Sequence, residues 1–87
     1  MRIEFDPAKR AETLRKRGLD LADAGQVFGD EILTVEDDRE DYGEPRLVTI
    51  GRIAGRMFFV VWTPRGGARR IIGMRKANDR EIARYSD

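Results

Sequence analysis

The sequence predicts a single α+β domain, residues 1–87, with two N-terminal helices packed on a mainly antiparallel four- to five-stranded sheet and a short C-terminal helix. Three observations predict this fold class. Two early segments carry helix caps and helically spaced apolar residues, three later segments rich in β-formers are joined by short glycine-bearing turns, and the chain closes on a helix start signal. A chain of 87 residues suits one compact domain.

The first elements are a short strand over residues 2–5 and a helix that begins after Asp6. Asp6 is a favourable N-cap, and Pro7 suits the first helical position, where its missing N–H breaks no hydrogen bond. The helix ends near Arg17 because Gly18 supplies a left-handed exit. Three residues on one face are expected to be buried: Ala8, Ala11 and Leu14. Three cations in the last turn complement the helix dipole: Arg15, Lys16 and Arg17.

A second helix is predicted to follow directly, with Asp20 as its N-cap and Gly29 at its end. Its apolar stripe is expected to face the sheet: Leu21, Ala24, Val27 and Phe28. The two helices then form a hairpin that covers one face of the sheet.

A strand over residues 32–35 leads into an acidic, turn-prone loop from Glu36 to Gly43, which we expect to be exposed. Carboxylates at alternate positions resemble a calcium loop. The central glycine and terminal glutamate of the EF-hand pattern are out of register, however, so we expect no metal site here.

Three strands follow, over residues 46–52, 56–63 and 69–76, and their short connections predict antiparallel hairpins. The middle strand is apolar on both faces, which is typical of a central strand in a sheet covered on both sides. We expect the helical hairpin to cover one face. The closing helix, residues 79–86, or a partner protein is expected to cover part of the other.

Charge is segregated along the chain, although the net charge is only +1. Residues 1–18 carry six cations against three anions, residues 19–45 one against ten, and residues 46–87 ten against three. The basic C-terminal half suits a polyanion such as RNA or DNA, and the acidic middle suits a basic partner. The alternative is that these runs are only solvated surface, with 14 arginines against 3 lysines reflecting a GC-rich genome.

Composition also narrows the cellular setting. There is no cysteine for disulfides or a thiolate metal site, no apolar run of the roughly 20 residues that a bilayer helix needs, and no signal-peptide layout at the first residues. We therefore expect a cytoplasmic protein with no membrane partner.

The absence of histidine excludes histidine-pair ribonuclease chemistry, histidine-bound metals and a Ser-His-Asp triad. Arginine, lysine, carboxylates and tyrosine still suffice for RNA cleavage by the substrate's own 2′-hydroxyl, which needs neither metal nor cofactor. Arginine pairs phosphate oxygens bidentately, and a lysine or glutamate with a shifted pKa accepts a proton. Five residues at strand ends are expected to converge on one rim of the sheet: Glu44, Arg46, Arg56, Arg75 and Lys76. The alternative is that Arg46 and Arg56 cap edge strands and that Glu44 pairs with one of them.

Several short motifs run in order along nearly the whole chain. They are Phe5-Asp6-Pro7-Ala8-Lys9, Leu14-Arg15-Lys16-Arg17-Gly18, Ala24-Gly25-Gln26-Val27-Phe28, Glu44-Pro45-Arg46, Ile50-Gly51-Arg52, Val60-Val61-Trp62-Thr63, Arg70-Ile71-Ile72-Gly73-Met74-Arg75-Lys76-Ala77, Arg80-Glu81 and Tyr85. In order and spacing they resemble the BrnT toxins of bacterial type II toxin–antitoxin systems. This resemblance implies a RelE-like fold and a metal-independent endoribonuclease that blocks translation. It also implies a hetero-oligomer with a BrnA-like antitoxin that binds DNA through a ribbon-helix-helix domain.

On this interpretation Arg75 and Arg46 hold the scissile phosphate, and Lys76 or Glu44 moves protons. Flanking RNA is contacted by three further residues: Arg56, Arg70 and Tyr85. The chain departs from the usual family pattern at two places. It has Lys16-Arg17-Gly18 where the family reads Lys-His-Gly, and Ile72-Gly73-Met74-Arg75-Lys76 where the family reads Ile-Ser-Ala-Arg-Lys. Because arginine stays protonated, Arg17 is no substitute for a histidine base. A catalytically silent homologue that binds the antitoxin and serves operon autoregulation is therefore the alternative function.

Overall fold

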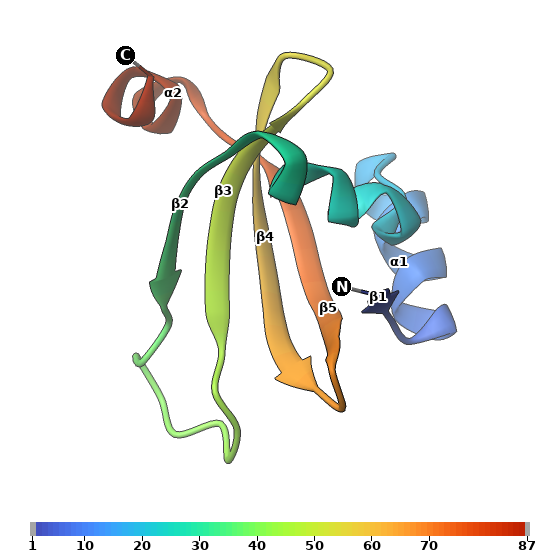
Figure 1. Cartoon of the computed structure of the whole chain (residues 1–87). Coiled ribbons are helices and arrows are strands. Elements are labelled where there is room, and N and C mark those ends of the chain that lie inside the picture. Colours follow the sequence, from blue (N-terminus) through green and yellow to red (C-terminus); the bar gives the residue numbers. More distant parts are fainter. Residues whose placement is uncertain (1, 87) are drawn as a thin grey trace.

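The computed structural model describes residues 2–86 and consists of one five-stranded sheet with three helical segments around it (Figure 1). The α+β class, the five strands and the C-terminal helix are confirmed. In chain order the elements are β1 (Arg2–Glu4), α1 (Pro7–Arg17), the 3₁₀ helix η1 (Leu21–Asp30), β2 (Glu31–Glu36), β3 (Leu47–Ile53), β4 (Arg56–Arg65), β5 (Ala68–Lys76) and α2 (Asp79–Tyr85).

The sheet has the strand order β1-β5-β4-β3-β2 and is mixed rather than antiparallel throughout. Strands β2 to β5 pair as antiparallel neighbours, and the hairpins of β3 to β5 are those that their short connections predicted. The first strand, β1, instead joins the last one, β5, in parallel, with Ile3 opposite Arg69. This pairing joins the two ends of the chain, so turn chemistry between neighbouring segments gave no sign of it.

Helix α1 has the predicted bounds and caps. The Asp6 carboxylate accepts the Ala8 N–H at 2.9 Å, and Gly18 adopts φ 68° while its N–H donates to the Leu14 carbonyl at 2.9 Å. Left-handed backbone of this kind favours glycine. Local capping rules therefore place this helix correctly along the chain.

The predicted second helix is a 3₁₀ helix, η1. Its predicted N-cap is right, because the Asp20 carboxylate accepts the Ala22 N–H at 2.9 Å. Gly25 and Gly29 lower its α-helical propensity, and it lies very close to β3. A Cβ on Gly51 of β3 would come within 2.4 Å of the Val27 carbonyl oxygen, so glycine is required there.

The core lies between η1 and one face of the sheet. The predicted stripe of η1 is confirmed, since Leu21, Ala24 and Val27 are fully buried. They pack in one cluster with the β4 side chains that point to this face: Phe58, Val60 and Trp62. The indole N–H of Trp62 donates to the Thr49 hydroxyl at 2.8 Å, which satisfies its polar group inside the core.

The orientation predicted for α1 is wrong. Ala8, Ala11 and Leu14 are exposed, Leu14 by 49%, and the buried residue of this helix is Thr13. Two alanines and one leucine offer little apolar area, so their burial contributes little to the orientation of the helix. A different face of α1, which is polar, turns toward the sheet.

The second face of the sheet is covered only at one end. Helix α2 reaches it there, with Tyr85 edge-on to Phe59 at 6.0 Å between ring centroids. Figure 1 shows α2 beyond one end of the strands, whereas α1 lies alongside β5. No helix among residues 2–86 combines the length and apolar character that crossing a membrane requires.

Candidate nucleic-acid interface

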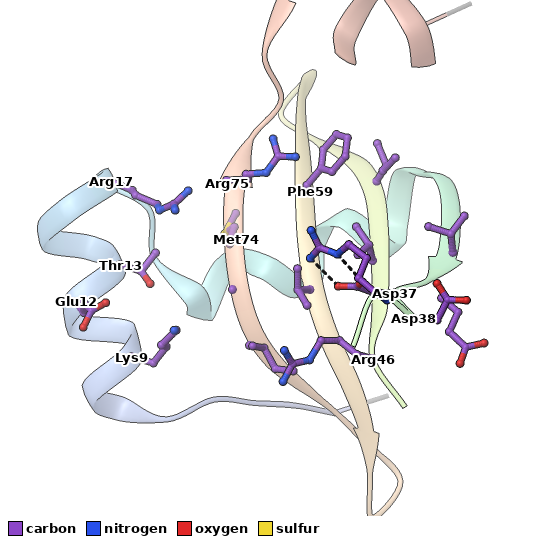
Figure 2. Close-up of a pocket in the computed structure, with 18 of the residues that line it drawn as sticks. Lys9, Glu12, Thr13, Arg17, Asp37, Asp38, Arg46, Phe59, Met74 and Arg75 are labelled. Atoms are coloured by element: carbon purple, nitrogen blue, oxygen red, sulfur yellow. Dashed lines mark hydrogen bonds and ion pairs between the residues drawn. The ribbon is translucent and has the colours of Figure 1, made fainter. Parts of the chain in front are cut away.

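The uncovered face of the sheet carries a groove of about 710 Å³, bounded by α1 on one side and by β2 with its following loop on the other (Figure 2). Its floor is largely apolar. Neighbouring strands contribute the side chains that point away from the core: Val48, Ile50, Phe59, Val61 and Ile72. An apolar floor suits flat groups such as nucleobases, which bind proteins through stacking and apolar contact.

The α1 wall of the groove is cationic. Lys9, Lys16 and Arg17 line it, together with Glu12 and Thr13. Figure 2 shows Lys9, Thr13 and Arg17 directed from α1 toward the sheet. Sequence reasoning explained Lys16 and Arg17 by the helix dipole and missed their shared face with Lys9. The available signal was their spacing, because residues 9, 12, 13, 16 and 17 form one helical face.

The opposite wall is acidic. Glu36, Asp37 and Asp38 line it, and Arg39 accompanies them. Arg39 binds Asp37 through two hydrogen bonds of 2.8 and 3.0 Å, which lowers the pKa of the Asp37 carboxyl. The groove as a whole holds six cationic and four anionic side chains, with the positive charge gathered toward α1 and the floor. A polyanion would therefore lie nearer α1 than β2.

Arg75 lies on the floor of the groove at the end that α2 covers. Its two terminal nitrogens donate to the two Glu81 carboxylate oxygens at 2.7 and 2.8 Å, and its guanidinium lies 4.3 Å from the Phe59 ring centroid. The hydrogen bonds raise the pKa of Arg75 and lower that of Glu81 to about 2. Arg75 is therefore a fixed cation whose side chain is still 42% exposed.

Arg46 lines the same groove near its other end, where the chain enters β3. Its guanidinium stacks on Tyr42, 3.8 Å from the ring centroid, and its Nε–H is buried with no partner among residues 2–86. A buried donor without an acceptor is costly for stability.

The expectation that five strand-end residues converge on one rim is wrong. Trp62 pairs with Leu47 and Phe59 with Arg75, so Arg46 and Arg75 are offset by four residues along β4, roughly 13 Å. Figure 2 shows them at different heights on the sheet. The groove still includes both arginines, together with Tyr85 of α2.

The other predicted site residues lie outside the groove. Lys76 is exposed and leaves the opposite face from Arg75, Glu44 is exposed in the loop before β3, and the structure of residues 2–86 records no ion pair for Glu44. Arg56 lines a separate pocket of about 370 Å³ beside the β3–β4 turn, and Arg70 lies 3.9 Å from Glu4 of β1. Within residues 2–86, no group of three or more potential ligand side chains is placed to hold a metal ion.

The family model for "Ribonuclease toxin, BrnT, of type II toxin-antitoxin system" matches residues 5–81 of this sequence. The chain belongs to the BrnT family. A search of curated proteins gave no match. Family membership identifies the chain as a ribonuclease toxin of a type II toxin–antitoxin system, with RNA as substrate and an antitoxin as partner.

The positions at which this BrnT chain departs from the usual family pattern lie together in the structure. Arg17 is on the α1 wall, and Gly73 and Met74 are on the adjacent strand β5, all three lining the groove. They are distant in sequence, and only the fold brings them to one surface.

Proposed function

We propose that the groove binds single-stranded RNA and that this chain cleaves the RNA without a metal ion, through attack of the substrate's own 2′-hydroxyl on the adjacent phosphorus. The observation that carries the proposal is the coincidence of two features at one surface. Cations line the groove from α1 and the floor, and the floor itself is largely apolar.

In this mechanism Arg75 and Arg46 both bind non-bridging phosphate oxygens, and Arg75 stabilises the charge that develops on the scissile phosphate in the transition state. The spacing between them assigns them to different phosphates of one strand, with Arg75 at the scissile one. Tyr85, Lys9 and Arg17 contact the flanking nucleotides. Arg56 and Arg70 lie outside the groove, so we no longer assign them this role.

Two proton transfers complete the reaction, since the 2′-hydroxyl loses a proton as it attacks and the departing 5′-oxygen gains one. Guanidinium groups do not transfer protons at neutral pH. Glu12 and Lys16 lie on the α1 wall with 3.6 Å between carboxylate and ammonium. We assign proton transfer to this pair in place of Glu44 and Lys76, which do not reach the groove.

We further propose that cleavage halts translation, that the chain shares the fold of RelE-type ribonucleases, and that a BrnA-like antitoxin with a ribbon-helix-helix domain neutralises it as a hetero-oligomer in the cytoplasm. Family membership supports the antitoxin, and the acidic segment from Glu36 to Asp41 supports a basic contact surface on it.

The test is cleavage of RNA by the purified protein, alone and with translating ribosomes. Arg75→Ala is expected to slow cleavage by at least about 100-fold, because the transition-state charge loses its main partner. Arg65→Ala, an exposed arginine in the β4–β5 hairpin, is the matched control and is expected to cleave normally. If Arg75→Ala cleaves as fast as wild type, the assignment of Arg75 is wrong.

One observation favours a second function. Because all three departures from the family pattern border the groove, they support a catalytically silent homologue that binds the antitoxin and serves operon autoregulation. Expression of the chain without antitoxin separates the two functions. Growth arrest supports the toxin, and normal growth in the presence of soluble, folded protein supports the silent module.

A further inference from the structure

Helix α2 has no buried residue and leaves Ile82 39% exposed, so apolar burial contributes little to holding it on the domain. Its recorded side-chain interactions with the sheet meet instead at a single point. Glu81 binds Arg75 directly, and Tyr85 packs edge-on against Phe59, the ring that stacks on the Arg75 guanidinium. The helix is thus organised around one arginine.

Glu81 is itself held from its other side. Its carboxylate accepts the Asn78 backbone N–H at 2.9 Å, while the Asn78 side chain accepts the Glu81 N–H at 2.8 Å. This capping box ties the carboxylate to the first turn of α2. Arg75 is therefore fixed by a carboxylate at its end and by the Phe59 ring on its face, and both contacts leave it little rotational freedom.

The contact with Glu81 uses the end of the guanidinium and leaves one side of it open. Among residues 2–86, the structure records no partner for the Nε–H of Arg75, and Nη2 makes only the bond to Glu81. Nε and the second N–H of Nη2 form a fork of the kind that pairs two oxygens of one phosphate. Arg75 can hold Glu81 and a phosphate at the same time.

We propose that Glu81 is a positioning residue that aims the free side of Arg75 at the scissile phosphate, and that α2 serves as its support. This inference rests on the proposed ribonuclease function. The competing arrangement, in which Glu81 occupies the phosphate's place and must leave, requires the loss of two charge-assisted bonds and of the α2 cap contact. A phosphate that binds the Nε and Nη2 side of Arg75 requires none of these losses.

Two variants distinguish a role of Glu81 in orienting Arg75 from a role only in stabilising α2. Glu81→Gln keeps an acceptor for the Asn78 N–H but replaces the ionic, two-bond contact with Arg75 by one hydrogen bond from the guanidinium to an uncharged amide oxygen. Asn78→Ala removes the cap on the Glu81 N–H and leaves the Glu81 carboxylate with Arg75. The two readouts are single-turnover cleavage of a single-stranded RNA and the NMR signal of the Arg75 Nε–H with a 2′-O-methyl RNA bound.

We expect Glu81→Gln to slow cleavage about 10-fold with KM changed less than about threefold, because misorientation acts on the chemical step. Its Arg75 Nε–H signal should broaden, whereas Asn78→Ala should cleave within about twofold of wild type. Cleavage by Glu81→Gln at the wild-type rate or faster, or an equal loss in Asn78→Ala, overturns the proposal. If the wild-type chain cleaves no RNA, the ribonuclease function fails. The Nε–H signal then decides alone, and a signal as sharp in Glu81→Gln as in wild type refutes the support of Arg75.

Discussion

The two faces of the sheet are built from the same strands yet differ in every respect that matters for function. On β4, Phe58, Val60 and Trp62 are buried beneath η1, whereas their neighbours Phe59 and Val61 form the floor of an open groove. One face is closed by apolar packing. The other is bordered by α1, three of whose cations line the groove while its apolar residues face solvent.

The reversed orientation of α1 is the most informative difference. An amphipathic helix on a globular domain ordinarily turns its apolar stripe to the core. Here Leu14 is 49% exposed, and Lys9 and Lys16 line the groove instead. The domain thus forgoes a modest apolar contribution to stability and gains a cationic wall beside an apolar floor, which is the combination that single-stranded nucleic acid requires.

The largest expected effect is on stability, and the same substitution, valine to alanine, is compared on the two faces of the sheet. Val60→Ala should lower the free energy of unfolding by about 2 kcal/mol, because Val60 is fully buried and its loss leaves a cavity. Val61→Ala, the adjacent residue on the groove floor, should cost less than about 1 kcal/mol. Denaturant unfolding measures both, and equal losses would contradict the assignment of an open and a closed face.

A smaller effect is expected on RNA binding when one of two adjacent cations of α1 is replaced. Lys16→Gln removes a groove cation, so the salt dependence of log K for single-stranded RNA should decrease by about 0.7 in slope. Arg15→Gln changes a neighbouring cation that does not line the groove, and its slope should match wild type. The slope is measured from the affinity for a 2′-O-methyl RNA across a series of salt concentrations. A similar change of slope in both variants would contradict RNA binding on the groove-facing side of α1.

The smallest expected effect is on acid stability at the α2 end of the groove. Hydrogen bonds from Arg75, and then from the Asn78 backbone, lower the pKa of Glu81 to about 2 from an ordinary 4.5. A carboxyl with a lowered folded-state pKa contributes stability that is complete above pH 4.5 and is lost as the pH falls toward 2. Thermal unfolding between pH 7 and 2 should therefore decline less steeply below pH 4.5 in Glu81→Gln. Parallel curves for the two proteins would contradict the stabilising Arg75–Glu81 contact.

Local rules predicted much of the fold and little of the site. The caps at Asp6, Gly18 and Asp20 follow from side-chain and backbone chemistry within a few residues, and the hairpins of β3 to β5 follow from their turns. The parallel pairing of β1 and the orientation of α1 depend on contacts between distant segments. The orientation of a helix depends on which of its faces is buried. The apolar stripe of α1 includes two alanines and has too little apolar area to predict that face.

The candidate site shows the same division. Arg75, Arg46 and Tyr85 were identified by residue type and position, and all three line the groove. Lys76 was misplaced because neighbours on a strand leave opposite faces, and Glu44 because it precedes β3 in an exposed loop. Glu81 was seen only as part of a motif, since its contact with Arg75 spans the junction between β5 and α2.

An NMR titration with a non-cleavable 2′-O-methyl RNA is the most direct test of RNA binding at the open face. We expect large shifts for Phe59, Val61 and Arg75, with the Trp62 indole N–H, bonded to Thr49 in the core, unchanged. Shifts confined to the η1 side of the sheet, or to Arg56 and its separate pocket, would contradict it.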